Sequence, residues 1–213
     1  MVRALRWVFF LLIVRPVIML VLGINVRHRE KLPHQGPAVL TANHNSHLDA
    51  LVLITLMPMR MLHRIRPVAA QDYFLRNRAL AWFSTRIIGI LPMPRGRTPD
   101  GDDPLAACDD ALNRGDILIF FPEGSRGEPE QMARFRGGVA KLAHTNPTVP
   151  VIPIYLHGLG KALPKGEAMV VPFFVDGLVG QALRGNDGHE DFLGELRRRM
   201  ETLAHEGNFA LWD

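Results

Sequence analysis

Short apolar runs, bounded by turn residues and separated by helix-length segments, constrain the fold of this chain most strongly. The runs lie at residues 24–28, 38–42, 67–70, 117–121, 149–156 and 169–175. The intervening segments with helical character lie at residues 47–56, 73–88, 103–113, 139–144 and 191–205. Strands that alternate with helices predict an α/β fold, with a central, mostly parallel or mixed sheet flanked by helices.

In two of the helical segments, the apolar residues predict which face of the helix is buried. In residues 73–88 the positions expected in the core are Leu75, Leu80, Trp82, Phe83 and Ile87. In residues 103–113 the shared apolar face is formed by Leu105, Cys108 and Leu112. We therefore interpret Cys108 as a core residue and not as a nucleophile.

Length and composition exclude several classes of protein. The 213 residues suffice for one domain with at most a short appendage, and a single cysteine excludes a disulfide framework or a Cys-rich zinc module. With 47% hydrophobic and 22% charged residues, the chain is not disordered.

Charge is distributed unevenly along the chain. Residues 1–100 hold 14 Lys and Arg against 4 Asp and Glu, whereas residues 101–213 hold 11 against 17. A basic half and an acidic half indicate a molecule with one side toward an anionic partner, either nucleic acid or an anionic membrane surface.

The N-terminus is the most apolar part of the sequence. Residues 7–14 and 17–22 are apolar, and Arg15 and Pro16 separate them. This interruption argues against a cleaved signal peptide and penalises a transmembrane helix. We expect residues 1–23 to form a short membrane-associating helix that lies in one leaflet, with Arg15 reaching the headgroups, and residues 24–213 to form the remaining domain. A single membrane span and a core helix of a soluble protein are the alternatives that stay open.

A polar segment follows the apolar run at 38–42 and reads NHNSHLD. Catalytic and binding sites in open α/β sheets form at the carboxyl ends of strands. His44 and Asp49 can meet if His44 lies on the loop and Asp49 in the first turn of the next helix, which would make His44 a carboxylate-oriented general base. The alternative is that Ser46 and Asp49 form a capping box without any chemistry.

A metal site is a second alternative for the same segment. His44, His47 and Asp49 resemble part of a binuclear metallohydrolase motif, but position 50 is Ala where that motif ends in His. A metallohydrolase that uses these three residues therefore stays open at this point.

Three further segments carry candidate site residues. The segment 121–127 reads FPEGSRG, which places Glu123, Gly124, Ser125 and Arg126 on a tight turn after a strand. The apolar run at 89–94 is followed directly by Arg95. In the run VPVIPI at 149–154, proline inside a strand predicts an edge strand or a bulge.

Taken in this order, the four segments resemble the glycerolipid acyltransferase family. That family is marked by N-H-x4-D, by an apolar block that ends in Arg, by F-P-E-G-S/T-R and by a proline-rich V-P-I-x-P block. Two minor matches lie at residues 68–74 and 135–138, and the resemblance extends from residue 25 to residue 156. The second block departs from the family pattern at its centre, where this chain has Leu-Pro-Met-Pro.

The resemblance implies roles for these residues. His44 would take the proton of the acceptor hydroxyl, and Asp49 would orient His44. The acceptor's glycerol phosphate would be bound by Arg95, Glu123, Gly124, Ser125 and Arg126. Backbone N–H groups near the start of the helix at residue 47 are candidates to stabilise the tetrahedral oxyanion.

The resemblance also implies the reaction and the partners. A fatty acyl group would pass from acyl-CoA or an acyl carrier protein to 1-acyl-glycerol 3-phosphate and give phosphatidate. Glycerol 3-phosphate and a lyso-aminolipid are alternative acceptors. We expect membrane lipids as partners, no nucleic acid, no metal and no cofactor, and a location at the cytoplasmic face of the cell membrane.

Overall fold

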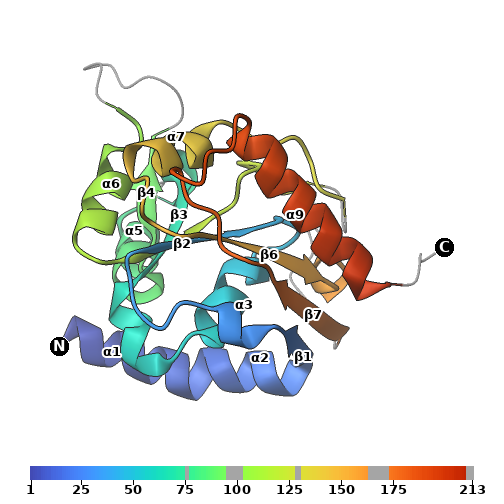
Figure 1. Ribbon diagram of the computed structural model, residues 1–213. Helices are drawn as coiled ribbons and strands as arrows, with labels where there is room; N and C mark the ends of the chain where they lie inside the picture. The colour runs from blue at the N-terminus through green and yellow to red at the C-terminus, as the bar shows by residue number, and fades with distance from the viewer. Residues whose placement is uncertain (75–76, 95–102, 128–130, 163–172, 210–213) are drawn as a thin grey trace.

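A seven-stranded sheet forms the centre of the computed structural model, which describes residues 1–74, 77–94, 103–127, 131–162 and 173–209 (Figure 1). The strands are β1 (Leu22–Arg27), β2 (Ala38–Ala42), β3 (Ile65–Ala70), β4 (Leu91–Met93), β5 (Ile117–Phe120), β6 (Val151–His157) and β7 (Phe173–Val179). Their order in the sheet is β1-β7-β6-β2-β5-β3-β4. Every neighbouring pair is parallel except β6 and β7, which are antiparallel. The predicted mixed sheet is therefore confirmed.

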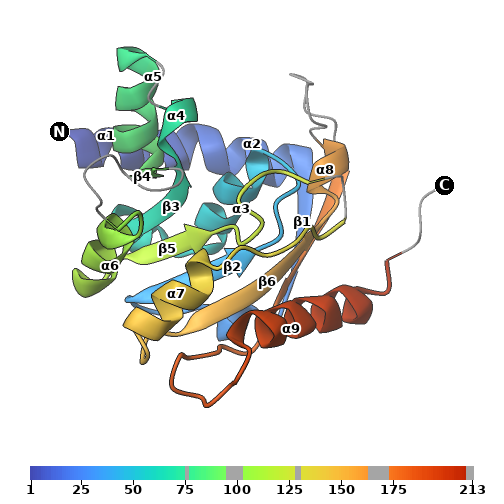
Figure 2. The ribbon, with the colours of Figure 1, turned by 90° about the horizontal axis from the view of Figure 1, so that it is seen from above.

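Helices cover both faces of this sheet. The α-helices are α1 (Val2–Phe9), α2 (Arg15–Val21), α3 (Leu48–Leu56), α4 (Gln71–Phe74), α5 (Arg78–Trp82), α6 (Ala106–Asn113), α7 (Gly138–Thr145), α8 (Leu159–Ala162) and α9 (Phe192–Gly207). Short 3-10 and π segments complete them: η1 (Phe10–Val14), η2 (Arg29–Lys31), η3 (Met59–Arg64) and η4 (Phe83–Ile88). Figure 2 shows α1 and α2 on one side of the sheet and α9 on the other.

The central strands are apolar on both faces because helices cover both. Along β5, Ile117 and Ile119 pack in the core shared with α1, α2 and α3, while Leu118 and Phe120 pack in the core shared with α6, α7 and α9. A strand buried on both faces reads as a continuous apolar run and not as an alternating one. This explains why the sequence revealed these strands clearly.

Two expectations from the sequence are wrong. Of the two placements that the prolines of β6 predicted, an edge strand or a bulge, the edge is excluded because β6 lies between β2 and β7. Strand β6 tolerates Pro153 because the antiparallel pairing with β7 starts only at Ile154, and Gly180 N–H donates to the Pro153 carbonyl at 2.8 Å. The missing proline N–H therefore falls at the end of the ladder.

The second wrong expectation concerns the core positions of residues 73–88, whose described residues lie mostly in α4, α5 and η4 and are thus helical as expected. Ile87 is buried as expected, but Trp82 and Phe83 are 48% and 37% exposed. Leu75 lies outside the described residues. In contrast, Leu105, Cys108 and Leu112 of the next helical segment are all buried, and burial raises the pKa of the Cys108 thiol to about 12.

Elements α1, η1 and α2 follow one another without a break and are called the N-terminal helix below. This helix has two different apolar faces. Its inner face contributes Phe10, Val14 and Ile18 to the main core, each at most 5% exposed. Its outer face is formed by Leu5, Trp7, Val8, Leu12, Ile13, Val17, Met19 and Leu20, which are 44–86% exposed. None of the described helices is long and apolar enough to cross a membrane.

Two arginines fix this helix to the domain. Arg6 is 5% exposed and donates through Nη2 to the carbonyls of Ile65 and Ile88, both at 3.0 Å. Arg15 donates to the Thr55 carbonyl of α3 at 3.4 Å. Arg15 therefore points to the domain, and the expectation that it reaches lipid headgroups is wrong.

The packing of the inner face predicts unequal effects of two substitutions. Phe10→Ala should lower the free energy of unfolding by about 3–5 kcal/mol, because it leaves a cavity in a closed core. Leu12→Ala, on the 66% exposed side chain of the same helix, should change it by less than about 0.5 kcal/mol. Denaturant unfolding of the full chain in mild detergent measures both, and equally small effects would contradict the packing of this helix on the domain.

Candidate active site

The loops that follow β2 and β5 lie side by side because these strands are parallel neighbours in the sheet. Their register pairs Thr41 with Phe120, so that residues 43–47 and 121–127 leave the sheet at the same edge. Gly127 N–H donates to the His44 carbonyl at 3.1 Å and joins the two loops directly. Two predicted site segments thus meet, as expected at the carboxyl ends of parallel strands.

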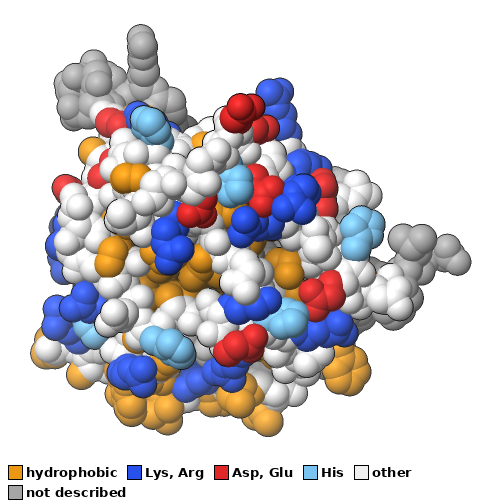
Figure 3. All heavy atoms as spheres, viewed as in Figure 1, with side chains coloured by type: hydrophobic (Ala, Val, Ile, Leu, Met, Phe, Trp, Pro, Cys, Tyr) orange, Lys and Arg blue, Asp and Glu red, His pale blue; other side chains and the backbone are white. Residues whose placement is uncertain are grey.

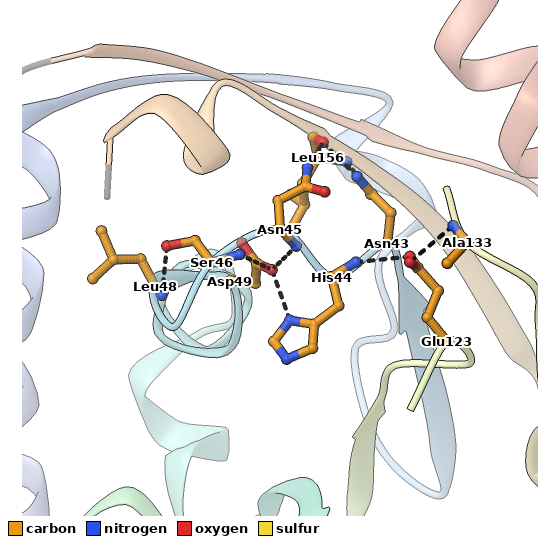
Figure 4. A network of polar contacts seen from close by, with 9 residues as sticks. All are labelled: Asn43, His44, Asn45, Ser46, Leu48, Asp49, Glu123, Ala133 and Leu156. Carbon is orange, nitrogen blue, oxygen red and sulfur yellow. Dashed lines mark hydrogen bonds and ion pairs between the residues drawn. The ribbon is translucent and has the colours of Figure 1, made fainter. Parts of the chain in front are cut away.

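His44 and Asp49 are in direct contact (Figure 4). Helix α3 begins at Leu48, which leaves His44 on the loop and Asp49 in the first turn. The distance between His44 Nδ1 and Asp49 Oδ2 is 2.9 Å. The sequence analysis predicted that the two side chains could meet only in this arrangement, and the prediction is confirmed.

Asp49 also organises the backbone of the loop. Its Oδ2 accepts the N–H groups of Asn45 at 2.7 Å and Ser46 at 2.8 Å, while Ser46 Oγ accepts the Leu48 N–H at 3.3 Å. Only one bond of the expected capping box therefore forms, from the Ser46 N–H to Asp49, and it occurs together with the contact with His44, while α3 has His47 at its N-cap and no side-chain cap there. Because the N–H groups of Asn45, Ser46 and Leu48 already donate within the loop, they are not free to stabilise an oxyanion as the sequence analysis expected.

The environment of Asp49 opposes its charge. The side chain is fully buried, and Oδ1 has no partner among the described residues. Burial raises the pKa of the Asp49 carboxyl above its ordinary value, while the hydrogen bonds from His44, Ser46 and Asn45 act in the opposite direction. A partner that carries an N–H, such as the His44 ring, is what stabilises the carboxylate there.

Glu123 lies behind the loop and not on the cavity wall. It is 3% exposed, and its two oxygens accept the N–H groups of His44 and Ala133, each at 3.0 Å (Figure 4). Burial raises the pKa of this carboxyl as well. Its observed contacts make Glu123 a positioning residue, and the expected contact with the acceptor stays a prediction.

Asn43 is a positioning residue that the sequence analysis did not single out. Its amide donates to the Leu156 carbonyl at 2.8 Å and accepts the Leu156 N–H at 2.7 Å. This reciprocal pair joins the loop after β2 to the end of β6. The sequence feature that could have identified Asn43 is its place at the start of the polar segment directly after a buried strand.

The His44 ring is held on its face as well as at Nδ1. It stacks on the Phe121 ring with 4.1 Å between the ring centroids and 18° between the planes. Stacking and the hydrogen bond to Asp49 together fix the direction of Nε2, which points away from Asp49 (Figure 4).

His44 lies on the wall of a cavity of about 710 Å³. Gly124, Ser125 and Arg126 also line it, and apolar walls come from β3 and from the segment around Ile90. Arg95 lies outside the described residues.

Arg136 is a cavity residue that the sequence analysis missed. It belongs to the segment 135–138, which served only as a minor match. Its side chain covers Gly124, where φ is +72° and a Cβ would lie 2.9 Å from Arg136 Cδ. Glycine at 124 therefore permits both the turn and the approach of this second guanidinium.

His47 is the other imidazole on the cavity wall. Its pKa is lowered by burial first, and then by the positive charge of Arg126. Among the described residues, no three His, Cys, Asp or Glu side chains are grouped so that they could hold a metal ion. The set of His44, His47 and Asp49 therefore receives no support from the geometry as a metal site.

Comparison with known proteins gives the family of this chain. The sequence model described as Acyltransferase matches residues 23–157. The chain belongs to the Acyltransferase family. The match includes both polar loops and strands β1 to β6, so it covers the whole site described above.

The chain is similar to curated 1-acyl-sn-glycerol-3-phosphate acyltransferases. It is 31% identical over 145 residues to a chloroplastic enzyme of Arabidopsis thaliana, which covers 68% of this chain and 38% of that protein. It is 28% identical over 136 residues to the alpha enzyme of Homo sapiens, covering 62% and 45%. This chain thus spans less than half the length of these relatives.

The fold is similar to the crystal structure of the 1-acyl-sn-glycerophosphate acyltransferase of Thermotoga maritima. The TM-score is 0.74 at 19% sequence identity, and the alignment covers 99% of this chain and 81% of that one. At this identity the likeness shows a shared α/β architecture.

The two roles of Asp49 predict that Asp49→Asn separates stability from activity. Native Asp49 binds its proton more tightly than the unfolded chain does, so its ionisation costs stability as the pH rises from its ordinary pKa to its raised one. Asn carries no such cost, and the stability of the variant relative to wild type should therefore increase across this pH interval. Its turnover should fall by about 10²–10⁴-fold.

Thermal unfolding at a series of pH values and an acyl-transfer assay measure the two effects. A variant that loses stability in proportion to its activity would show that Asp49 acts only as a helix cap.

Proposed function

We propose that this protein transfers a fatty acyl group from an acyl thioester to the free hydroxyl of 1-acyl-glycerol 3-phosphate and gives phosphatidate. The observation that carries the proposal is the 2.9 Å contact between His44 Nδ1 and the buried Asp49, with the other ring nitrogen on the wall of a large cavity. Membership of the Acyltransferase family and the likeness to curated lysophosphatidate acyltransferases support it.

The contact with Asp49 selects the tautomer that the reaction needs. The carboxylate accepts a proton-bearing Nδ1, which leaves a lone pair on Nε2. Nε2 then takes the proton of the acceptor hydroxyl while the hydroxyl oxygen attacks the thioester carbonyl carbon. Collapse of the tetrahedral intermediate breaks the C–S bond, and His44 returns the proton to the leaving sulfur. The atoms balance without a metal or a cofactor.

Positive charge on the cavity wall favours an acceptor that carries phosphate. Arg126 and Arg136 line the cavity together with Ser125, and guanidinium groups bind phosphate through two parallel hydrogen bonds. Lysophosphatidate and glycerol 3-phosphate both present this group. Arg95, the other predicted phosphate ligand, belongs to the same proposal.

The apolar part of the cavity favours an acceptor with an acyl chain over glycerol 3-phosphate. Leu51, Val68 and Ile90 contribute apolar surface to a volume of about 710 Å³. Burial of a hydrocarbon chain there contributes about 0.8 kcal/mol per methylene group. The donor thioester can come from acyl-CoA or from an acyl carrier protein, since both present the same reacting atoms.

Residues 1–23 are proposed to hold the protein on the membrane that contains its acceptor, at the cytoplasmic face. The support is the outer face of the N-terminal helix, where Leu12, Met19 and Leu20 are 66–86% exposed. Such a face on a helix whose other side packs on the domain suits a helix that lies in the plane of the interface.

Two histidine substitutions test which imidazole is the base. With purified full-length protein, lysophosphatidate and acyl-CoA or acyl carrier protein, His44→Ala should lower turnover by about 10²–10⁴-fold. His47→Ala is the matched control, since His47 is the other imidazole on the wall of the same cavity. It should retain most of the turnover.

A purified protein that transfers no acyl group from either donor to lysophosphatidate would contradict the proposed reaction. Equal losses in the two variants would contradict the assignment of His44 as the base.

A further inference from the structure

A second cavity, of about 460 Å³, lies between the start of α1, η3 and η4. It opens near the start of β3, whereas the cavity at His44 is lined by residues 67–70 toward the other end of that strand. The basic side chains that line it are Arg3, Arg6, Arg60, His63, Arg66 and Arg86. They come from three segments that are far apart in the sequence, and their convergence is a product of the fold.

Positive charge in this cavity is largely unbalanced. Among the residues that the structure describes, the one ion pair that involves these side chains joins Arg66 Nε to Asp116 Oδ2 at 3.2 Å. Arg3, Arg60 and Arg86 are exposed at the rim, whereas Arg6 lies at the floor. Like charges gathered in one hollow repel one another, and an anion bound among them removes that cost.

Arg6 supplies a fixed charge. Its hydrogen bonds to the Ile65 and Ile88 carbonyls hold the guanidinium in place, and its Nε has no partner within the described residues. Burial and, to a lesser extent, the charge of Arg66 lower the pKa of Arg6 to about 10. A buried arginine that is still charged at neutral pH favours the binding of a counter-charge nearby.

The position of the cavity indicates the source of that anion. Trp7 lines the cavity and also belongs to the exposed apolar face of α1, and Trp82 and Phe83 are exposed on the adjoining segment. Phe83 contacts Phe9 of α1 edge to face, with 5.4 Å between the ring centroids. Figure 3 shows apolar side chains gathered along the edge formed by α1 and α2, with Lys and Arg side chains directly beside them. This pattern matches the boundary between acyl chains and headgroups.

We infer that this cavity binds the phosphate of an anionic phospholipid headgroup, at a site separate from the catalytic cavity. The rim arginines, Arg60 and Arg86, would grip the phosphate oxygens, and the apolar face of α1 would meet the acyl chains. The inference rests on the proposed membrane association of residues 1–23 but not on the proposed reaction. Its consequence is that the protein would prefer anionic membranes and bind them in one orientation.

Calorimetric titration of the full chain in neutral detergent with dihexanoyl phosphatidylglycerol tests the inference. This lipid is anionic and is neither the proposed acceptor nor the proposed product. Arg60→Gln and Arg86→Gln should each weaken its binding by about 10–100-fold, because each removes a charge-assisted contact. Dihexanoyl phosphatidylcholine, which carries no net charge, should bind more weakly to wild type and lose little in the variants.

Arg78→Gln is the matched control. Arg78 is exposed on α5, in the same segment as Arg86, but it does not line the cavity. The substitution Arg78→Gln removes the same charge from the same side of the protein and should leave the binding of phosphatidylglycerol nearly unchanged. An equal loss in Arg78→Gln would show diffuse attraction to an anionic surface and would overturn the site.

Two further measurements test for a soluble ligand in this cavity and for binding of the lipid in the catalytic cavity. Coenzyme A or inorganic phosphate that displaces the lipid at low concentration would assign the cavity to a soluble ligand and overturn the lipid assignment. His44→Ala should bind phosphatidylglycerol as wild type does, so a failure of the proposed acyl transfer leaves this result readable. A loss of binding in His44→Ala would place the lipid in the catalytic cavity and overturn the inference.

Discussion

A single carboxylate oxygen holds the candidate active site together. Asp49 Oδ2 accepts hydrogen bonds from the His44 ring and from the N–H groups of Asn45 and Ser46. The backbone bonds fix the loop after β2, and the contact with the ring fixes the direction of the imidazole. Because Asp49 is fully buried, these donors are what stabilises its charge, and the site depends on all of them at once.

The sheet brings the other parts of the site to this carboxylate. Parallel pairing of β2 and β5 places the two polar loops side by side, and Glu123 of the second loop accepts the His44 N–H of the first loop and also the N–H of Ala133. Asn43 ties the same loop to β6. Buried polar groups that are hydrogen-bonded in this way make a rigid support for the His44 loop.

Much of the fold and of the site could be predicted from the sequence, for a physical reason. Strands covered on both faces are continuous apolar runs, and polar residues directly after them mark the carboxyl edge of the sheet. Trp82 and Phe83 were misplaced because an apolar helical face looks the same whether it meets a protein core or the outside. Arg136 was missed because only the fold brings it over Gly124, and the exclusion of Glu123 from the cavity depends on tertiary contacts in the same way.

Nitrogen NMR of the histidine rings tests whether Asp49 selects the tautomer of His44. With ring-labelled histidine in the full chain at alkaline pH, we expect His44 to carry its proton on Nδ1 and Nε2 to be unprotonated. Asp49→Asn should shift the population toward the other tautomer, because the carboxylate that selects it is gone. A wild-type His44 that carries its proton on Nε2 would show that Asp49 does not select the tautomer.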